Sequence, residues 1–266
     1  MKLAAFVLSL LLLPLPGLYL GGREWSGLVL SEPADDAGIA AALHTSMMLL
    51  FYTLLLNHVT RRLTGGAPLD TQRFMRAAAA GALLGWLASY LNLFVASWTH
   101  QQEPSWLLAL LLYTPLFALT APALLVTRAF FAGFPVLENA LASLPSLPAP
   151  NPKIAAMLAA AALSGLTAGA AAPHQFAWLF WASPALLMYA LQWQRQTARD
   201  AAGSGQLMFA MLSGIVVGNF ALASYQANAS LAIELPAGLT QPGYALFGLL
   251  CLQLIGLTGG AQKTNP

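Results

Sequence analysis

The sequence predicts an all-α, polytopic membrane helical bundle with about eight transmembrane helices, and three observations carry this prediction. Apolar residues make up 58% of the 266 positions and charged residues only 8%, too few to cover a water-soluble protein of this size. Eight long apolar stretches follow one another, and none has a charged side chain near its middle. The segments between them alternate in charge, as loops on opposite sides of a membrane do.

A span needs about 20 apolar residues to cross ~30 Å of hydrocarbon. Stretches of this kind predict spans at 3–20, 38–60, 75–98, 105–127, 153–172, 175–194, 206–226 and 240–260. The first resembles a secretory signal, but it contains Pro14 and Pro16 and lacks an Ala-x-Ala cleavage pattern, so we expect an uncleaved span. Internal prolines predict kinks in the fourth and sixth spans, at Pro115, Pro122 and Pro184.

The charges of the connecting segments predict the orientation. Acidic residues dominate the connection after the first span, and Glu103 is the only charge between the third and fourth. Basic residues gather in the connections on the opposite side: Arg61, Arg62, Arg73, Arg76, Arg128, Lys153, Arg195 and Arg199. The positive-inside rule therefore predicts an inner (plasma) membrane protein with both termini in the cytoplasm.

The longest cytoplasmic connection divides the chain into two predicted halves. Residues 1–128 form an N-terminal four-span half, 129–152 a Pro-rich interfacial linker, and 153–266 a C-terminal four-span half. We expect the first part of the linker to be a short helix at the headgroup level. Its later prolines predict a stiff spacer between the halves.

Similar patterns in the two halves indicate an internal duplication. The third span has Gly81 and Gly85 before an Ala-Ser-Tyr triplet; the seventh has Gly214 and Gly218 before the same triplet, two residues further on. The other spans align through Tyr52–Tyr189, Arg62–Arg199, Pro104–Pro242, Trp106–Tyr244 and Leu119–Leu257. Such G-x-x-x-G pairs let helix backbones approach closely. Halves with an even number of spans are parallel, so a ligand site would be expected between them.

Two histidines of the second span, His44 and His58, lie about four helical turns apart on one face. This spacing resembles that of the haem-ligating histidines in dihaem b-type cytochromes. The remaining histidines, His100 and His174, stand at outer span ends level with His44, so His58 has no histidine partner. The candidate cofactor site is therefore one bis-histidine haem b on the outer side, held by His44 together with His100 or His174. A hydrogen-bonded interfacial histidine is the alternative interpretation.

The same outer region is a candidate quinol site, since such sites combine a histidine and a carboxylate with aromatic walls near a membrane surface. His100 and Glu103 lie between Trp98 and Trp106 in the sequence. An aromatic belt with solvated loop charges is the alternative. Two asparagines within the spans are expected either to bond across helices or to line a substrate cavity between the halves. The candidate substrate contacts are thus Glu103, Trp106, Asn92 and Asn219.

Several function classes are excluded or left without support. The net charge of +2 and the lack of a basic run argue against a nucleic-acid partner. The sequence has no nucleophile elbow, zinc-protease motif, P-loop or paired intramembrane aspartates, and it suggests no metal site. The single cysteine, Cys251, lies in an apolar stretch and is expected to be buried and inert.

These observations favour a non-catalytic membrane protein, a subunit or scaffold whose partners are the lipid bilayer and other subunits of a membrane complex. Two alternatives stay open. One is a quinol- or haem-binding membrane anchor of a redox complex. In architecture alone, eight spans in two four-helix halves resemble the quinol-oxidising anchor subunits of molybdenum oxidoreductases. The other is a carrier for a neutral or lipid-like solute, using the cleft between the halves.

Overall fold

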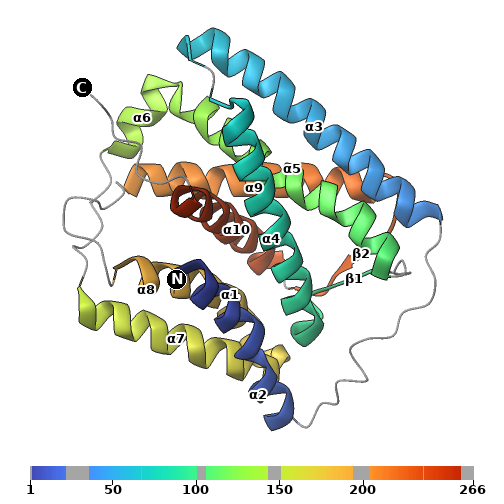
Figure 1. The fold of residues 1–266 in the computed structure, drawn as a ribbon, viewed down its shortest axis with the longest axis vertical. Coiled ribbons are helices and arrows are strands. Elements are labelled where there is room, and N and C mark those ends of the chain that lie inside the picture. The colour runs from blue at the N-terminus through green and yellow to red at the C-terminus, as the bar shows by residue number, and fades with distance from the viewer. Residues whose placement is uncertain are drawn as a thin grey trace.

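The computed structural model describes residues 2–21, 36–66, 68–100, 106–142, 151–193, 204–235 and 237–258, and about 88% of these are helical (Figure 1). The elements are α1 (Lys2–Leu12), α2 (Pro14–Leu20), α3 (Asp36–Thr64), α4 (Thr71–Val95), β1 (Trp98–His100), α5 (Trp106–Ala132), α6 (Pro135–Ala142), α7 (Pro152–Ala171), α8 (Pro173–Trp193), α9 (Ser204–Gln226), β2 (Leu231–Ile233) and α10 (Ala237–Thr258).

The predicted all-α membrane bundle is confirmed, but the count of eight spans is not. Within the described residues, six helices are long and apolar enough to cross a membrane: α3, α4, α5, α7, α9 and α10. The chain is therefore a multi-pass membrane protein. The first predicted span is divided into α1 and α2, because Pro14 has no N–H to continue the helix and instead begins a new one. The third ends at Val95 rather than 98, since Ala96 adopts a left-handed conformation with φ 47°.

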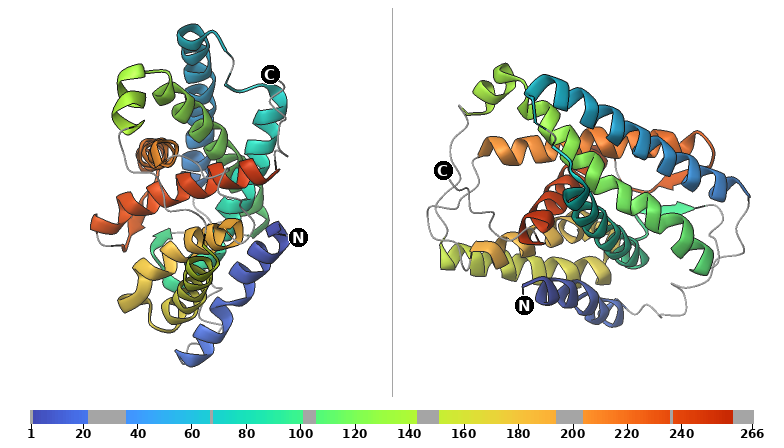
Figure 2. Two further views of the ribbon diagram at one scale, coloured as in Figure 1. Left: turned by 90° about the vertical axis from the view of Figure 1, so that its left-hand side faces the viewer. Right: turned by 45° about the horizontal axis from the view of Figure 1, so that its top comes forward.

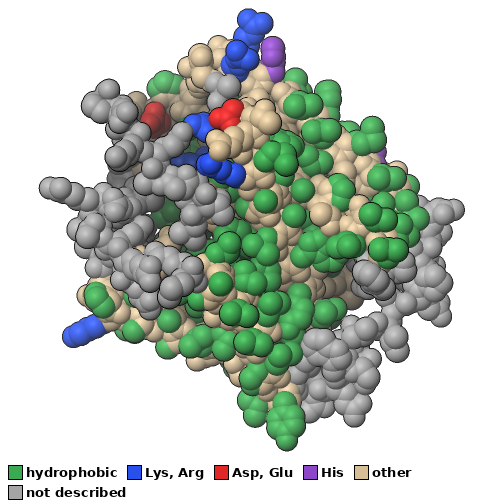
Figure 3. Space-filling view, in the orientation of Figure 1, with side chains coloured by type: hydrophobic (Ala, Val, Ile, Leu, Met, Phe, Trp, Pro, Cys, Tyr) green, Lys and Arg blue, Asp and Glu red, His purple; other side chains and the backbone are tan. Residues whose placement is uncertain are grey.

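Successive long helices run in alternate directions between two ends of the molecule. At one end, Thr64 of α3 lies beside Gly133 after α5, and Gly205 of α9 lies beside Leu141 of α6. We call this the basic end, because the described helix ends near it carry Arg61, Arg62, Arg73, Arg76, Arg128 and Lys153. In Figure 3 the blue Lys and Arg side chains lie toward the top and left of the molecule. The other end carries β1 and β2, at the right of Figure 1, and is called the ribbon end.

Glycines bring α4 against α5 and α9 against α10 in the same way. A Cβ atom at Gly85 would collide with the ring of Phe117, and one at Gly218 would collide with the ring of Tyr244. A Cβ at Gly214 would collide with the backbone carbonyl of Tyr244. The predicted close approach at these G-x-x-x-G pairs is confirmed. The matching contacts align Tyr244 with Phe117, however, and not with Trp106 as the sequence alignment has it.

One continuous hydrophobic core joins helices from both sides of α6. It includes fully buried side chains from five helices: Phe6 of α1, Phe94 of α4, Leu124 of α5, Phe180 of α8 and Cys251 of α10. The N-terminal helices also cross from one predicted half to the other. Gly17 of α2 lies against Thr167 and Ala170 of α7, and both views of Figure 2 show α1 and α2 beside α7. Among the described residues, the larger buried cluster therefore draws on helices from both predicted halves.

The helix expected at the start of the linker is present as α6, which exposes Val136 and Leu137. The Pro-rich part of the linker, 143–150, lies outside the described residues. Helices α5 and α8 continue through Pro115, Pro122 and Pro184.

Candidate functional site at the ribbon end

Asn92, near the end of α4, holds the chain as it turns from helix to strand. Its Oδ1 accepts hydrogen bonds from the backbone N–H of Ser97 (2.8 Å) and of Trp98 (3.2 Å). Its Nδ2 donates to the carbonyl oxygen of Trp98 at 2.7 Å. Backbone groups outside helices and ladders need such partners at membrane depth. The side chain therefore fixes the start of β1.

The two short strands pair antiparallel and connect the α4–α5 loop to the α9–α10 loop. Trp98 lies opposite Ile233, and His100 lies opposite Leu231. The N–H of Glu234 donates to the carbonyl of Ser97 at 2.9 Å, which extends the pairing by one bond. The ribbon thus joins segments from the two predicted halves of the chain.

Trp181 adds α8 to this end of the molecule. Its ring stacks on Trp98, with a centroid distance of 5.1 Å and an interplanar angle of 28°. Its Nε1–H donates to the hydroxyl of the buried Ser97 at 2.7 Å. A buried tryptophan usually needs such a partner for its N–H. The stack and the hydrogen bond together fix the orientation of the Trp181 ring.

His44 of α3 is half-buried, and its Nδ1 lies 3.1 Å from the carbonyl oxygen of Ser224 on α9. A carbonyl only accepts, so Nδ1 carries the proton and donates. In the neutral ring this leaves Nε2 as an acceptor. The next residue on α9, Tyr225, has its hydroxyl 3.5 Å from that of Tyr113 on α5.

The three histidines of the candidate haem site, His44, His100 and His174, belong to elements at this end. No described contact connects one of them to another. His174 is exposed in the first turn of α8. His100 is the last residue of β1, and its side chain lies outside the described residues. The described partner of His44 is a backbone carbonyl, as in the interfacial alternative. A haem held by His44 together with His100 or His174 stays a prediction.

Of the four predicted substrate contacts, the structure describes the side chains of Asn92 and Asn219. Glu103 and the side chain of Trp106, the first residue of α5, lie outside the described residues. Asn92 uses its polar atoms to hold β1, as described above. Asn219 of α9 is exposed and pairs reciprocally with Gln241 of α10, with N···O distances of 2.8 and 2.9 Å. The amide pair across two helices agrees with the structural alternative; a substrate role for these residues stays a prediction.

Sequence reasoning missed three residues that matter here: Trp181, Tyr113 and Gln241. Each acts through a contact distant in sequence, with Ser97, Tyr225 and Asn219 respectively. Gln241 offered a usable signal, because it is a strong hydrogen-bonding group close to the start of an apolar stretch.

Further contacts connect the same helices away from the ribbon. Midway along α3, the ring of Tyr52 packs on Phe220 of α9 at a centroid distance of 4.9 Å, and its hydroxyl bonds Thr127 of α5 at 2.7 Å. At the basic end, the guanidinium of Arg128 donates to the side-chain oxygen of Gln206 on α9. The connection between α3/α5 and α9 therefore runs from one end of the bundle to the other.

An open groove of about 460 Å³ lies between α2 and α7. Its lining is mostly apolar: Leu20, Leu163, Ser164, Thr167, Ala168 and Ala171. None of the predicted site residues lines it.

Comparisons with protein-family models, with curated proteins and with solved structures found no match to this chain. The function is therefore argued from the fold and its contacts.

Proposed function

We propose that the protein is a non-catalytic, multi-pass inner-membrane scaffold or subunit. In this proposal the helices before α6 (α1–α5) and those after it (α7–α10) move as one rigid body. One observation carries the proposal: α3 and α5 are connected to α9 at the ribbon end, in the middle and at the basic end, through His44, Tyr52 and Arg128. A carrier with alternating access has to rock one half against the other. Connections at both ends and a shared core oppose such motion.

The proposed topology has eight crossings, with the basic end and both termini in the cytoplasm. Basic residues lie at the end of α3, the start of α4, the end of α5 and the start of α7, and the positive-inside rule places such residues in the cytoplasm. Helix α8 has 21 residues, or about 32 Å at 1.5 Å per residue, which is enough to cross. Helices α1 and α2 lie along α7 and would together form the first crossing.

The pairs α4/α5 and α9/α10 are, in this proposal, duplicated units. Each pair consists of a helix with two glycines, a three-residue strand, and a helix whose aromatic side chain packs on the glycines. Antiparallel pairing of β1 with β2 is the relation expected between equivalent strands across a twofold axis. A polar contact also repeats, as Trp86 Nε1 with Thr114 Oγ1 in one pair and Asn219 with Gln241 in the other.

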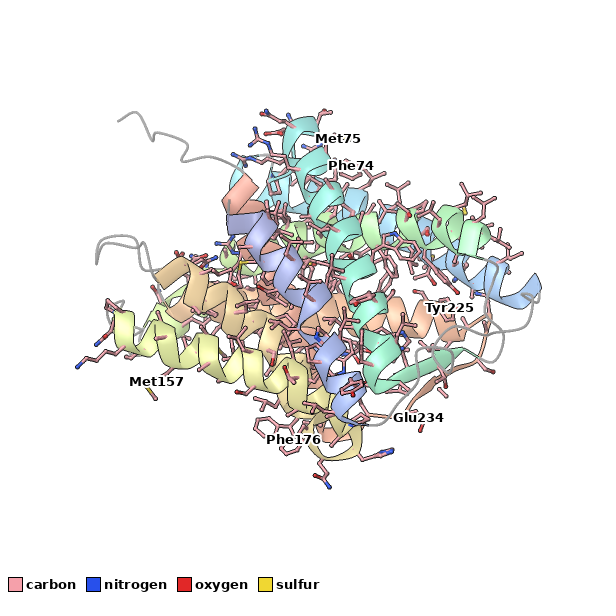
Figure 4. The ribbon with its side chains drawn as sticks, turned by 60° about the horizontal axis from the view of Figure 1, so that its bottom comes forward. Phe74, Met75, Met157, Phe176, Tyr225 and Glu234 are labelled. Atoms are coloured by element: carbon pink, nitrogen blue, oxygen red, sulfur yellow. The ribbon has the colours of Figure 1, made fainter. Side chains whose placement is uncertain are left out.

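Rigidity can be measured as the distance between spin labels on the two halves. Leu63 of α3 and Met157 of α7 are exposed near the basic end, and Met75 of α4 serves for a control within one half; Met75 and Met157 point away from the bundle in Figure 4. The variants are Leu63→Cys/Met157→Cys and Leu63→Cys/Met75→Cys. The native Cys251 is fully buried and should not be labelled. The measurement is made in lipid nanodiscs, with labelled chain diluted by unlabelled chain so that only distances within one chain are seen. We expect one narrow distance distribution for each pair.

A redox anchor is the second candidate function, and the His44 geometry favours it. Ligand histidines usually donate their other ring N–H to a carbonyl or carboxylate, as Nδ1 of His44 does to Ser224. Nε2 would then bind a haem iron or a quinol oxygen. If this candidate holds, protein expressed with haem shows a haem band in a reduced-minus-oxidised spectrum, and His44→Ala abolishes it. A flat spectrum removes the haem form of the candidate.

A further inference from the structure

Arg128 of α5 is a half-buried cation near the basic end of the molecule. It lies four residues before the end of α5, or about 6 Å along the helix axis. Its one hydrogen bond among the described residues goes to a neutral acceptor, the side-chain oxygen of Gln206 on α9. A guanidinium has five N–H donors in a fixed plane. Most of the donors of Arg128 therefore have no acceptor among the described residues.

No described carboxylate pairs with Arg128. Among the described residues the only ion pair joins Arg73 to Asp70, at the start of α4. Gln206 stands in the first turn of α9, where a helix carries partial positive charge, so this helix end adds to the charge of the guanidinium. A cation that is partly withdrawn from water is costly unless an anion pairs with it. The surroundings of Arg128 therefore favour an anionic ligand.

Helix α6 marks the level of the membrane surface at this end. With eight residues it is too short to cross the bilayer, and it exposes the apolar side chains of Val136 and Leu137. A helix of this kind lies at the boundary between lipid headgroups and acyl chains. Gly205 lies beside the last turn of α6, and its neighbour Gln206 binds Arg128. The guanidinium is therefore close to α6, at the depth of the lipid phosphates.

We infer that Arg128 and Gln206 bind the phosphate of a phospholipid in the membrane leaflet at the basic end. A guanidinium can bind two phosphate oxygens side by side, and the Nε2 of Gln206 can donate a further hydrogen bond. Gln206 is exposed, so a phosphate reaches the pair from the surface of the molecule. Basic sites between transmembrane helices bind lipid headgroups in this way. The inference does not depend on the scaffold proposal, since a carrier or a redox anchor would bind the same lipid.

Native mass spectrometry of the detergent-purified chain tests the site, with phosphatidylglycerol as the probe. Arg128→Gln should weaken phosphatidylglycerol binding about tenfold, the scale of one hydrogen bond to a charged group. Arg62→Gln is the matched control, because it removes the same charge from an exposed position at the same end, and it should leave binding unchanged. Diacylglycerol, which has acyl chains but no phosphate, should bind the unaltered chain about tenfold more weakly than phosphatidylglycerol.

The variant Gln206→Ala keeps the test decisive if Arg128→Gln does not fold. It changes an exposed side chain, leaves the charge of Arg128 in place and should weaken phosphatidylglycerol binding about threefold, the scale of one neutral hydrogen bond. Unchanged binding in Gln206→Ala, equal binding in Arg128→Gln and Arg62→Gln, or equal binding of diacylglycerol would overturn the inference. Thermal stabilisation of the chain by inorganic phosphate as large as that by phosphatidylglycerol would overturn it too, since the ligand would then be a soluble anion.

Discussion

Replacing Gly214 by alanine is expected to lower the free energy of unfolding by about 3 kcal/mol, at the upper end of the usual cost of overpacking. The added Cβ would collide with the carbonyl oxygen of Tyr244 and would lie 3.1 Å from the Cα of Gly248. Both are backbone atoms, which cannot move aside as a side-chain rotamer can. Helices α9 and α10 would have to separate, and the ring of Tyr244 would leave Gly218.

Gly243 provides the matched control, because it lies beside Tyr244 in the same helix and a Cβ there meets no atom within 4 Å. Gly243→Ala should leave stability unchanged or raise it by up to ~1 kcal/mol, the helix propensity difference between the two residues. Denaturant unfolding in mixed micelles measures both variants. Equal stability of the two variants would contradict the packing described for α9 and α10.

The second large effect is expected at Asn92. Asn92→Leu should cost about 2–4 kcal/mol, because the N–H groups of Ser97 and Trp98 lose their acceptor and each orphaned donor costs ~1–3 kcal/mol. Loss of the hydrogen bonds between Asn92 and the backbone of Ser97 and Trp98 should also separate the ring of Trp98 from that of Trp181. The fluorescence of these tryptophans would report the change.

Asn92→Asp separates the two functions of the amide. The carboxylate keeps an oxygen for both N–H groups but loses the donor to the Trp98 carbonyl. We expect it to retain more than half of the stability that Asn92→Leu loses. If both variants unfold alike, the acceptor contacts at Ser97 and Trp98 do not hold the start of β1.

The sequence was sufficient to predict what hydropathy and glycine spacing determine. In the described residues all eight apolar stretches are largely helical, apart from the break at Leu13 and the end of the third helix at Val95, and the G-x-x-x-G pairs lie at close helix contacts. These features are local, since one face of one helix carries the whole signal. Hydropathy alone does not divide the first span, because Pro14 and Pro16 are apolar; the division comes from the N–H that Pro14 lacks.

The ribbon end could not be predicted, for a physical reason. A strand of three residues is too short to show an alternation of apolar and polar side chains. The left-handed position before it is occupied by Ala96, whereas glycine or asparagine usually marks such a turn. The contacts that organise this end join distant segments, such as Ser97 with Trp181. The predicted span boundaries place histidines and tryptophans at this end, but they do not indicate which of these side chains contact one another.

The spin-label distance between Leu63 and Met157 tests the central claim most directly, because these residues report on two groups of helices at the end opposite the ribbon. A rigid scaffold predicts one narrow distribution, as narrow as that of the Leu63–Met75 control and unchanged by temperature or added solutes. Two distances, or one that shifts when a solute is added while the control stays constant, would contradict the rigid body and support a carrier.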